Sequence, residues 1–145
     1  MKMKKLIGKA VGTLVLCGTV VATLPMVAQA TENVSWGATS STSGSTIKTG
    51  KLSKLTTSSI FANYTSGPSS ILYATAWAHW GLDESNYTNV TYYNSSHYNY
   101  TLTPSSVTYV DILNTAHEDY GDCMVQLRFQ TNASGYHSGK WRADY

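Results

Sequence analysis

The stretch Ile71-Leu72-Tyr73-Ala74-Thr75-Ala76-Trp77-Ala78-His79-Trp80 decides how the rest of this chain is interpreted. It is the most apolar run beyond the amino-terminal segment, and no acid, lysine, arginine, glycine or proline interrupts it. With a period of two it has one face of larger side chains around Trp77 and one face of alanines that ends in Trp80. With a helical period, Tyr73, Trp77 and Trp80 share a face, and Gly81 follows as a helix stop.

The flanking segments favour the strand. Short runs rich in β-branched and aromatic residues recur on both sides, separated by turns of Gly, Pro, Asn and Ser, and no sustained helical period is visible after residue 30. We therefore expect a central strand at 71–80, with Trp77 facing the core and Trp80 on the opposite, alanine-lined face. The other expected strands are 59–64, 88–93, 97–103, 107–113, 123–130 and 136–143.

These segments predict an all-β fold, an antiparallel β-sandwich or meander of about six to eight short strands within residues 59–145. Segments 88–93 and 97–103 alternate around Asn94-Ser95-Ser96, a pattern that predicts a hairpin. The last two expected strands are joined by a turn at 132–135.

Residues 31–58 are polar and dominated by Ser and Thr, so a flexible Ser/Thr-rich arm is expected before the β domain. Val34 and Trp36 are compatible with a short edge strand at its start. Ile47 and Leu52 lie among lysines and predict either a weak strand pair around Gly50 or a solvated run, of which the solvated run is favoured.

Residues 1–30 have the pattern of a cleaved signal peptide. Lysines at the start are followed by an apolar stretch from Val11 to Val27 and by the small-x-small sequence Ala28-Gln29-Ala30. The apolar stretch is short and contains Gly and Pro, which favours a leader over a membrane anchor. We expect cleavage after Ala30, secretion, and no stable membrane span in the mature chain.

Removal of this leader changes the charge. It carries four of the ten Lys and Arg residues, which leaves six against eight Asp and Glu. A mature chain of that balance has no basic patch for nucleic acid. Cys123 becomes the only cysteine, so no internal disulfide is expected, and burial of this thiol is favoured.

The sequence contains no recognisable set of catalytic or metal-binding residues, so we expect no enzyme and no cofactor. His117-Glu118-Asp119-x-x-Asp122 is the densest cluster of ligand atoms, but it lacks the spacing of a calcium loop and is interpreted as a solvated connection. There is no Gly-x-Ser-x-Gly motif. The histidines fall on separate segments without the local pairs of zinc sites, so no metal site is predicted: His79, His97, His117 and His137.

Aromatic side chains with a polar tip are in excess, with eleven Tyr and four Trp against two Phe. Such rings suit half-exposed positions and contact surfaces. We expect Trp77, Phe129 and Trp141 to fill the core and the tyrosines around the 88–103 hairpin to be exposed. The candidate ligand- or partner-binding residues are Trp80, Tyr92, Tyr93, Tyr98 and Tyr100.

Several short motifs carry a resemblance. The Lys-rich leader, Ala74-Thr75-Ala76-Trp77, Val125-x-Leu127-Arg128 and Ser138-Gly139-Lys140-Trp141 resemble a group of small exported proteins of Gram-positive bacteria with no established function. The Gly-Lys-Trp sequence near the end is also similar to lactococcin-type bacteriocins. The resemblance implies export and a β fold.

The sequence therefore predicts an exported, non-enzymatic β-domain that acts by contact with a cell surface or a partner protein, in the manner of a bacteriocin. A carbohydrate- or cell-wall-binding module is the alternative function.

Overall fold

The computed structural model describes residues 32–80, 84–92 and 100–144. It contains ten strands, a short α-helix and a single 3-10 turn in those ranges. The elements are β1 (Val34–Ser40), β2 (Thr46–Lys48), β3 (Leu52–Lys54), β4 (Ile60–Ala62), β5 (Leu72–His79), η1 (Glu84–Asn86), β6 (Thr88–Asn89), β7 (Tyr100–Leu102), β8 (Val110–Ile112), α2 (Ala116–Tyr120), β9 (Cys123–Thr131) and β10 (Gly135–Arg142).

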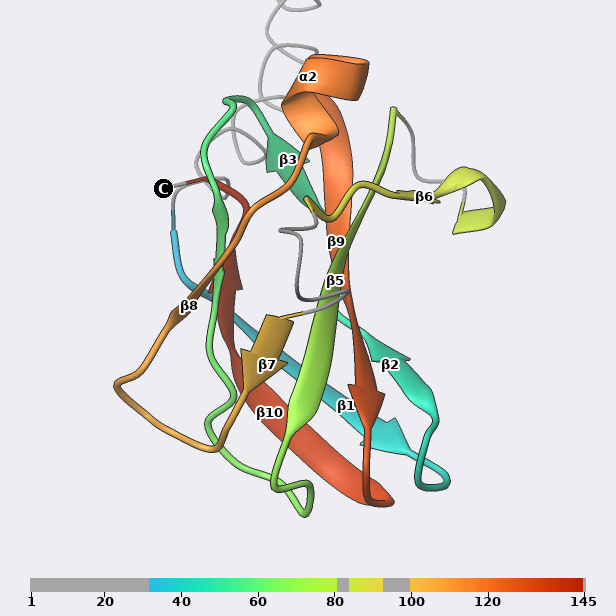
Figure 1. Ribbon diagram of the computed structural model, residues 1–145, viewed down its shortest axis with the longest axis vertical. Helices are drawn as coiled ribbons and strands as arrows, with labels where there is room; N and C mark the ends of the chain where they lie inside the picture. The colour runs from blue at the N-terminus through green and yellow to red at the C-terminus, as the bar shows by residue number, and fades with distance from the viewer. Residues whose placement is uncertain (1–31, 81–83, 93–99, 145) are drawn as a thin grey trace, which may run out of the picture.

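The strands form two antiparallel sheets (Figure 1). Sheet A has the order β1-β10-β4-β8. Sheet B is built on the long pair β5 and β9, with β2 and β3 following one another along the outer edge of β9, and β6 and β7 along the outer edge of β5. The expected all-β sandwich is confirmed.

The core lies between the sheets, and two aromatic rings meet across it. Trp36 on β1 stacks on Phe129 of β9 with ring centroids 4.6 Å apart. Opposite Trp36 in the ladder is Gly139, where a Cβ would collide with the indole ring. The indole N–H donates to the carbonyl oxygen of Asn63 at 3.2 Å, so this ring is buried without leaving its polar atom unsatisfied.

The stretch 71–80 forms β5, as expected, but its faces are reversed. Ala74, Ala76 and Ala78 are fully buried, whereas Trp77 is only partly buried and faces outward. The alanines are paired in register with Phe129, Leu127 and Val125 of β9, which supply the core volume that β5 lacks. The expectation that Trp77 faces the core is therefore wrong, whereas Phe129 and Trp141 are in the core as expected.

The expected flexible arm is also wrong for the part that the structure describes, whereas the short edge strand allowed at Val34 and Trp36 is present as β1. Residues 34–40 pair with β10, and β2 and β3 each pair with β9. Each of the two short strands buries one apolar side chain, Ile47 in β2 and Leu52 in β3. Burial against β9 overrides the weak local propensity of this Ser/Thr-rich sequence.

Two expected connections differ in the structure. Segments 88–93 and 97–103 do not pair with each other where they are described, because β6 and β7 both pair with β5. The turn expected between them lies outside the described residues. The strands joined by residues 132–134 belong to different sheets, β9 to sheet B and β10 to sheet A, so they do not form a hairpin.

The leader at 1–30 lies outside the described residues. Among those that are described, no helix has the length and apolar character needed to cross a membrane.

The alanine face of β5 predicts intolerance to larger side chains. Ala76→Leu should lower the free energy of unfolding by about 1–3 kcal/mol, because overpacking a filled core forces strained rotamers. Thr101→Leu, at an exposed position of β7, is the matched control and should change it by less than about 0.5 kcal/mol. Chemical denaturation measures both, and equal midpoints for the two variants would contradict this packing.

The buried thiol predicts low reactivity. Burial, the largest effect, raises the pKa of Cys123 to about 11, so the thiol stays protonated at ordinary pH. In the full chain carrying Cys17→Ser, a thiol reagent at neutral to mildly alkaline pH should label Cys123 only after denaturation. Rapid labelling in native buffer would show that the thiol is accessible.

Candidate functional site

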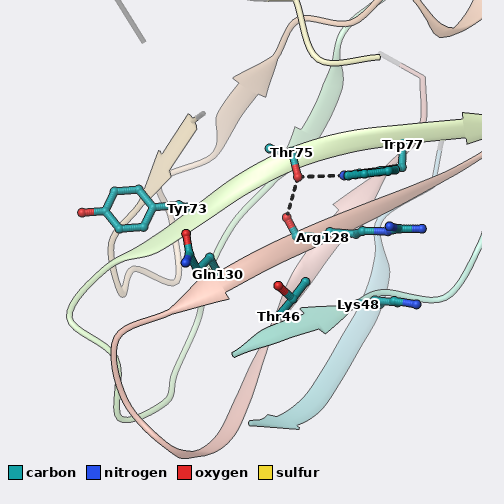
Figure 2. Close-up of a pocket in the computed structure, with 7 residues that line it drawn as sticks. All are labelled: Thr46, Lys48, Tyr73, Thr75, Trp77, Arg128 and Gln130. Carbon is teal, nitrogen blue, oxygen red and sulfur yellow. Dashed lines mark hydrogen bonds between the residues drawn. The ribbon is translucent and has the colours of Figure 1, made fainter. Parts of the chain in front are cut away.

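The outward face of sheet B carries an open pocket of about 430 Å³. We call it the sheet B pocket. Its side chains come from three adjacent strands, β2, β5 and β9 (Figure 2). The lining residues are Thr46, Lys48, Tyr73, Thr75, Trp77, Arg128 and Gln130.

The strand register sets these side chains in rows across the sheet. Thr75 and Lys48 are both paired with Arg128, so the three lie side by side on one face. Tyr73 and Thr46 are both paired with Gln130 and form the next row. Period-two alternation along each strand places the core residues behind this surface.

Trp77 and Arg128 form the rigid centre of the pocket. The Arg128 guanidinium lies over the Trp77 ring, 3.8 Å from its centroid. The indole N–H donates to Thr75 Oγ1 at 3.0 Å, and this hydroxyl donates to the Arg128 carbonyl oxygen at 3.3 Å (Figure 2). Arg128 Nε also donates to Gln126 Oε1 at 3.4 Å. The ring and the guanidinium are thus oriented before any ligand arrives.

The lining of the pocket suits an anionic, hydroxyl-rich ligand. Among the described residues that line it are two cationic side chains, Lys48 and Arg128, and no Asp or Glu. Figure 2 shows the side chains of Arg128 and Lys48 extending in a common direction, the Trp77 ring turned toward Thr75, and Tyr73 at the other end. Aromatic faces stack on sugar rings, amides and hydroxyls exchange hydrogen bonds with sugar hydroxyls, and the cations attract carboxylate or phosphate.

Of the residues that the sequence suggested for binding, those that the structure describes lie elsewhere. Trp80 is 74% exposed and Tyr92 is 54% exposed, but neither lines the sheet B pocket. Tyr100 packs against the core, and its hydroxyl donates to the Tyr92 carbonyl oxygen at 3.2 Å. Burial raises the pKa of Tyr100. Tyr93 and Tyr98 lie outside the described residues.

The acidic segment at 117–122 is mostly the short helix α2 rather than an irregular connection. Ala116 anchors it in the core, and Thr115 Oγ1 donates to Asp119 at 2.6 Å. His117 Nε2 is 3.4 Å from Asp122. Within the part of the chain that the structure describes, no three His, Cys, Asp or Glu residues gather in a metal-binding arrangement.

A buried trio of Ser40, His137 and Tyr64 was not anticipated from sequence. Ser40 Oγ lies 3.0 Å from His137 Nε2, and Tyr64 Oη lies 3.1 Å from His137 Nδ1. All three residues are buried, and burial raises the pKa of Tyr64. The Ser40 hydroxyl also donates to the carbonyl oxygen of Ala133 at 2.8 Å. The Ser40 hydroxyl is the group of this trio that could act as a nucleophile, but it is buried and a substrate could not reach it. We therefore interpret the trio as a structural network.

A second pocket on the outward face of sheet A is less suited to a ligand. The Tyr136 phenol reaches over Gly37, where an added Cβ would collide with it. Its described lining includes one cationic side chain, Lys140, whereas the sheet B pocket has Lys48 and Arg128. This comparison favours the sheet B pocket.

The sequence contained one signal for the sheet B pocket. Thr75 and His79 share the Trp77 face of β5, whereas the other face carries only apolar residues. Polar neighbours in alternation mark a solvated face. No local sequence pattern indicates that Lys48 and Arg128 lie beside Trp77, since this depends on which strands become neighbours.

Comparisons with known proteins identify no relative: no family model matches this chain, and no curated protein or solved structure is significantly similar to it.

Proposed function

We propose that this protein is an exported, non-enzymatic β-domain that acts by contact with a cell surface, and that it binds a negatively charged glycan of that surface through the sheet B pocket. The single observation that carries the proposal is the Arg128 guanidinium stacked on Trp77 in an open pocket. Export, with cleavage after Ala30, is inferred from the leader pattern at 1–30.

The charge distribution supports an anionic ligand. The chain after Ala30 has more acids than bases, so a polyanion is repelled by most of the molecule and needs a local cationic site. The sheet B pocket gathers Lys48 and Arg128. A planar guanidinium recognises carboxylate or phosphate in two-point geometry, which makes Arg128 the expected specificity residue.

A second candidate function is contact with a partner protein through Trp80, as in competition between bacteria. The observation that favours it is the high exposure of this large ring at the end of β5. Growth inhibition of related strains that is lost in Trp80→Ala and kept in Trp77→Ala would favour this second function.

The pair Trp77→Ala and Trp80→Ala separates the two surfaces. Binding to insoluble Gram-positive cell walls with their anionic polymers intact should weaken at least tenfold in Trp77→Ala, since truncating an aromatic anchor costs on the order of 2 kcal/mol. Trp80→Ala should bind as the unchanged protein does. Co-sedimentation measures both affinities, and equal retention of all three proteins would contradict the proposal.

Salt and charge give an independent prediction. Binding to these walls should fall as ionic strength rises, because exposed charges are screened within about 10 Å at 0.1 M salt. Lys48→Gln should weaken binding and flatten this salt dependence. Lys140→Gln, an exposed lysine on sheet A, should do neither. Walls stripped of their anionic polymers should retain little protein, and undiminished retention on them would exclude an anionic ligand.

A further inference from the structure

The two sheets are joined at one end by a buried pair of opposite charges. Lys54 is on β3 of sheet B, and Asp144 follows β10 of sheet A. Lys54 Nζ lies 2.5 Å from Asp144 Oδ1, and the two side chains are 0% and 2% exposed. Removing two full charges from water is costly, and their attraction repays that cost only with good geometry and further hydrogen bonds.

Asp144 is held by three donors besides Lys54. Its Oδ2 accepts the Leu55 N–H at 2.9 Å. Its Oδ1 accepts the hydroxyl of Thr56 at 2.9 Å and that of Ser58 at 3.3 Å. The two carboxylate oxygens are therefore inequivalent, since one faces a fixed backbone donor and the other faces the ammonium group and two hydroxyls.

The hydroxyls also connect the nitrogen to the carboxylate. Lys54 Nζ donates to Ser58 Oγ at 3.3 Å and to the Ser58 carbonyl oxygen at 2.5 Å. Ser58 Oγ lies 2.7 Å from Thr56 Oγ1, which donates to Asp144 Oδ1. A proton thus has a continuous path from Nζ through two hydroxyls to Oδ1.

We propose that Lys54 and Asp144 condense to an intramolecular amide, a covalent cross-link between the sheets. The bond that forms joins Lys54 Nζ to Asp144 Cγ, and the bond that breaks joins Cγ to Oδ1. The ammonium nitrogen gives up two protons, and Oδ1 leaves with both as one molecule of water. Oδ2 remains as the amide oxygen on the Leu55 N–H. The ion pair supplies every atom, so no oxidant or other reactant is needed.

Geometry and burial both drive this condensation. Two groups fixed in contact react as one molecule, which removes the entropy cost of bringing them together. The product is uncharged, so it no longer bears the cost of burying two ions. Exclusion of water from a pair this deeply buried also opposes hydrolysis of the amide.

Mass spectrometry of the denatured full chain tests the proposal. The unchanged protein should be lighter than its sequence by the mass of one water, and a digest should contain a branched peptide joining Lys54 to Asp144. Lys54→Arg and Asp144→Ala, processed in the same way, should have the full mass. An unchanged protein of full mass after prolonged incubation in the folded state would overturn the cross-link, as would water loss in Lys54→Arg.

A second variant keeps both reacting groups and tests the proton path. Thr56→Val with Ser58→Ala retains Lys54 and Asp144 but removes the two hydroxyls. Newly purified protein should then lose water more slowly than the unchanged chain does. Thr57→Val with Ser59→Ala, the next Thr and Ser along the loop, is the matched control and should react at the unchanged rate. Equal rates in all three proteins would overturn the hydroxyl path.

Discussion

The structure depends on the fit between a strand of small residues and the aromatic rings that face it. Ala74 and Ala76 leave the inner face of β5 nearly flat, and Phe129 on β9 fills the space beside them. Trp36 reaches across from sheet A and stacks on Phe129. Because side chains alternate along a strand, this arrangement sends Trp77 outward and creates the aromatic surface of the sheet B pocket. The packing of the core therefore also determines which side chains of β5 line the candidate site.

Sequence patterns predicted the strands that alternate over many residues. Segment 123–130 has a continuous apolar face, and segment 136–143 places Gly139, Trp141 and Ala143 on one face, so burial of these faces specifies the two strands. The short strands β2 and β3 each bury little on their own and exist because β9 offers an edge to pair with. A non-local partner of this kind leaves no periodic signal in a Ser/Thr-rich segment.

The orientation of Trp77 shows a further limit of pattern analysis. Both faces of 71–80 contain apolar residues, and hydrophobicity alone favours the larger ring as the buried one. The choice is made by volume, because β9 and β1 already contribute Phe129 and Trp36. Similarly, the sheet B pocket joins Lys48, Trp77 and Arg128 from distant parts of the chain. The exposed side chains of Trp80 and Tyr92 were predictable one by one, but the assembled site was not.

The pairing of β1 with β10 has a consequence for the order of assembly. Val34 lies opposite Trp141, so sheet A closes only when segments about a hundred residues apart meet. When the chain is synthesised or exported from its amino terminus, β1 therefore has no partner strand until β10 follows. The Ser/Thr-rich composition of that region keeps the waiting strand hydrated and poorly suited to self-association. The polar composition that predicted a flexible arm therefore also protects the incompletely synthesised protein from association.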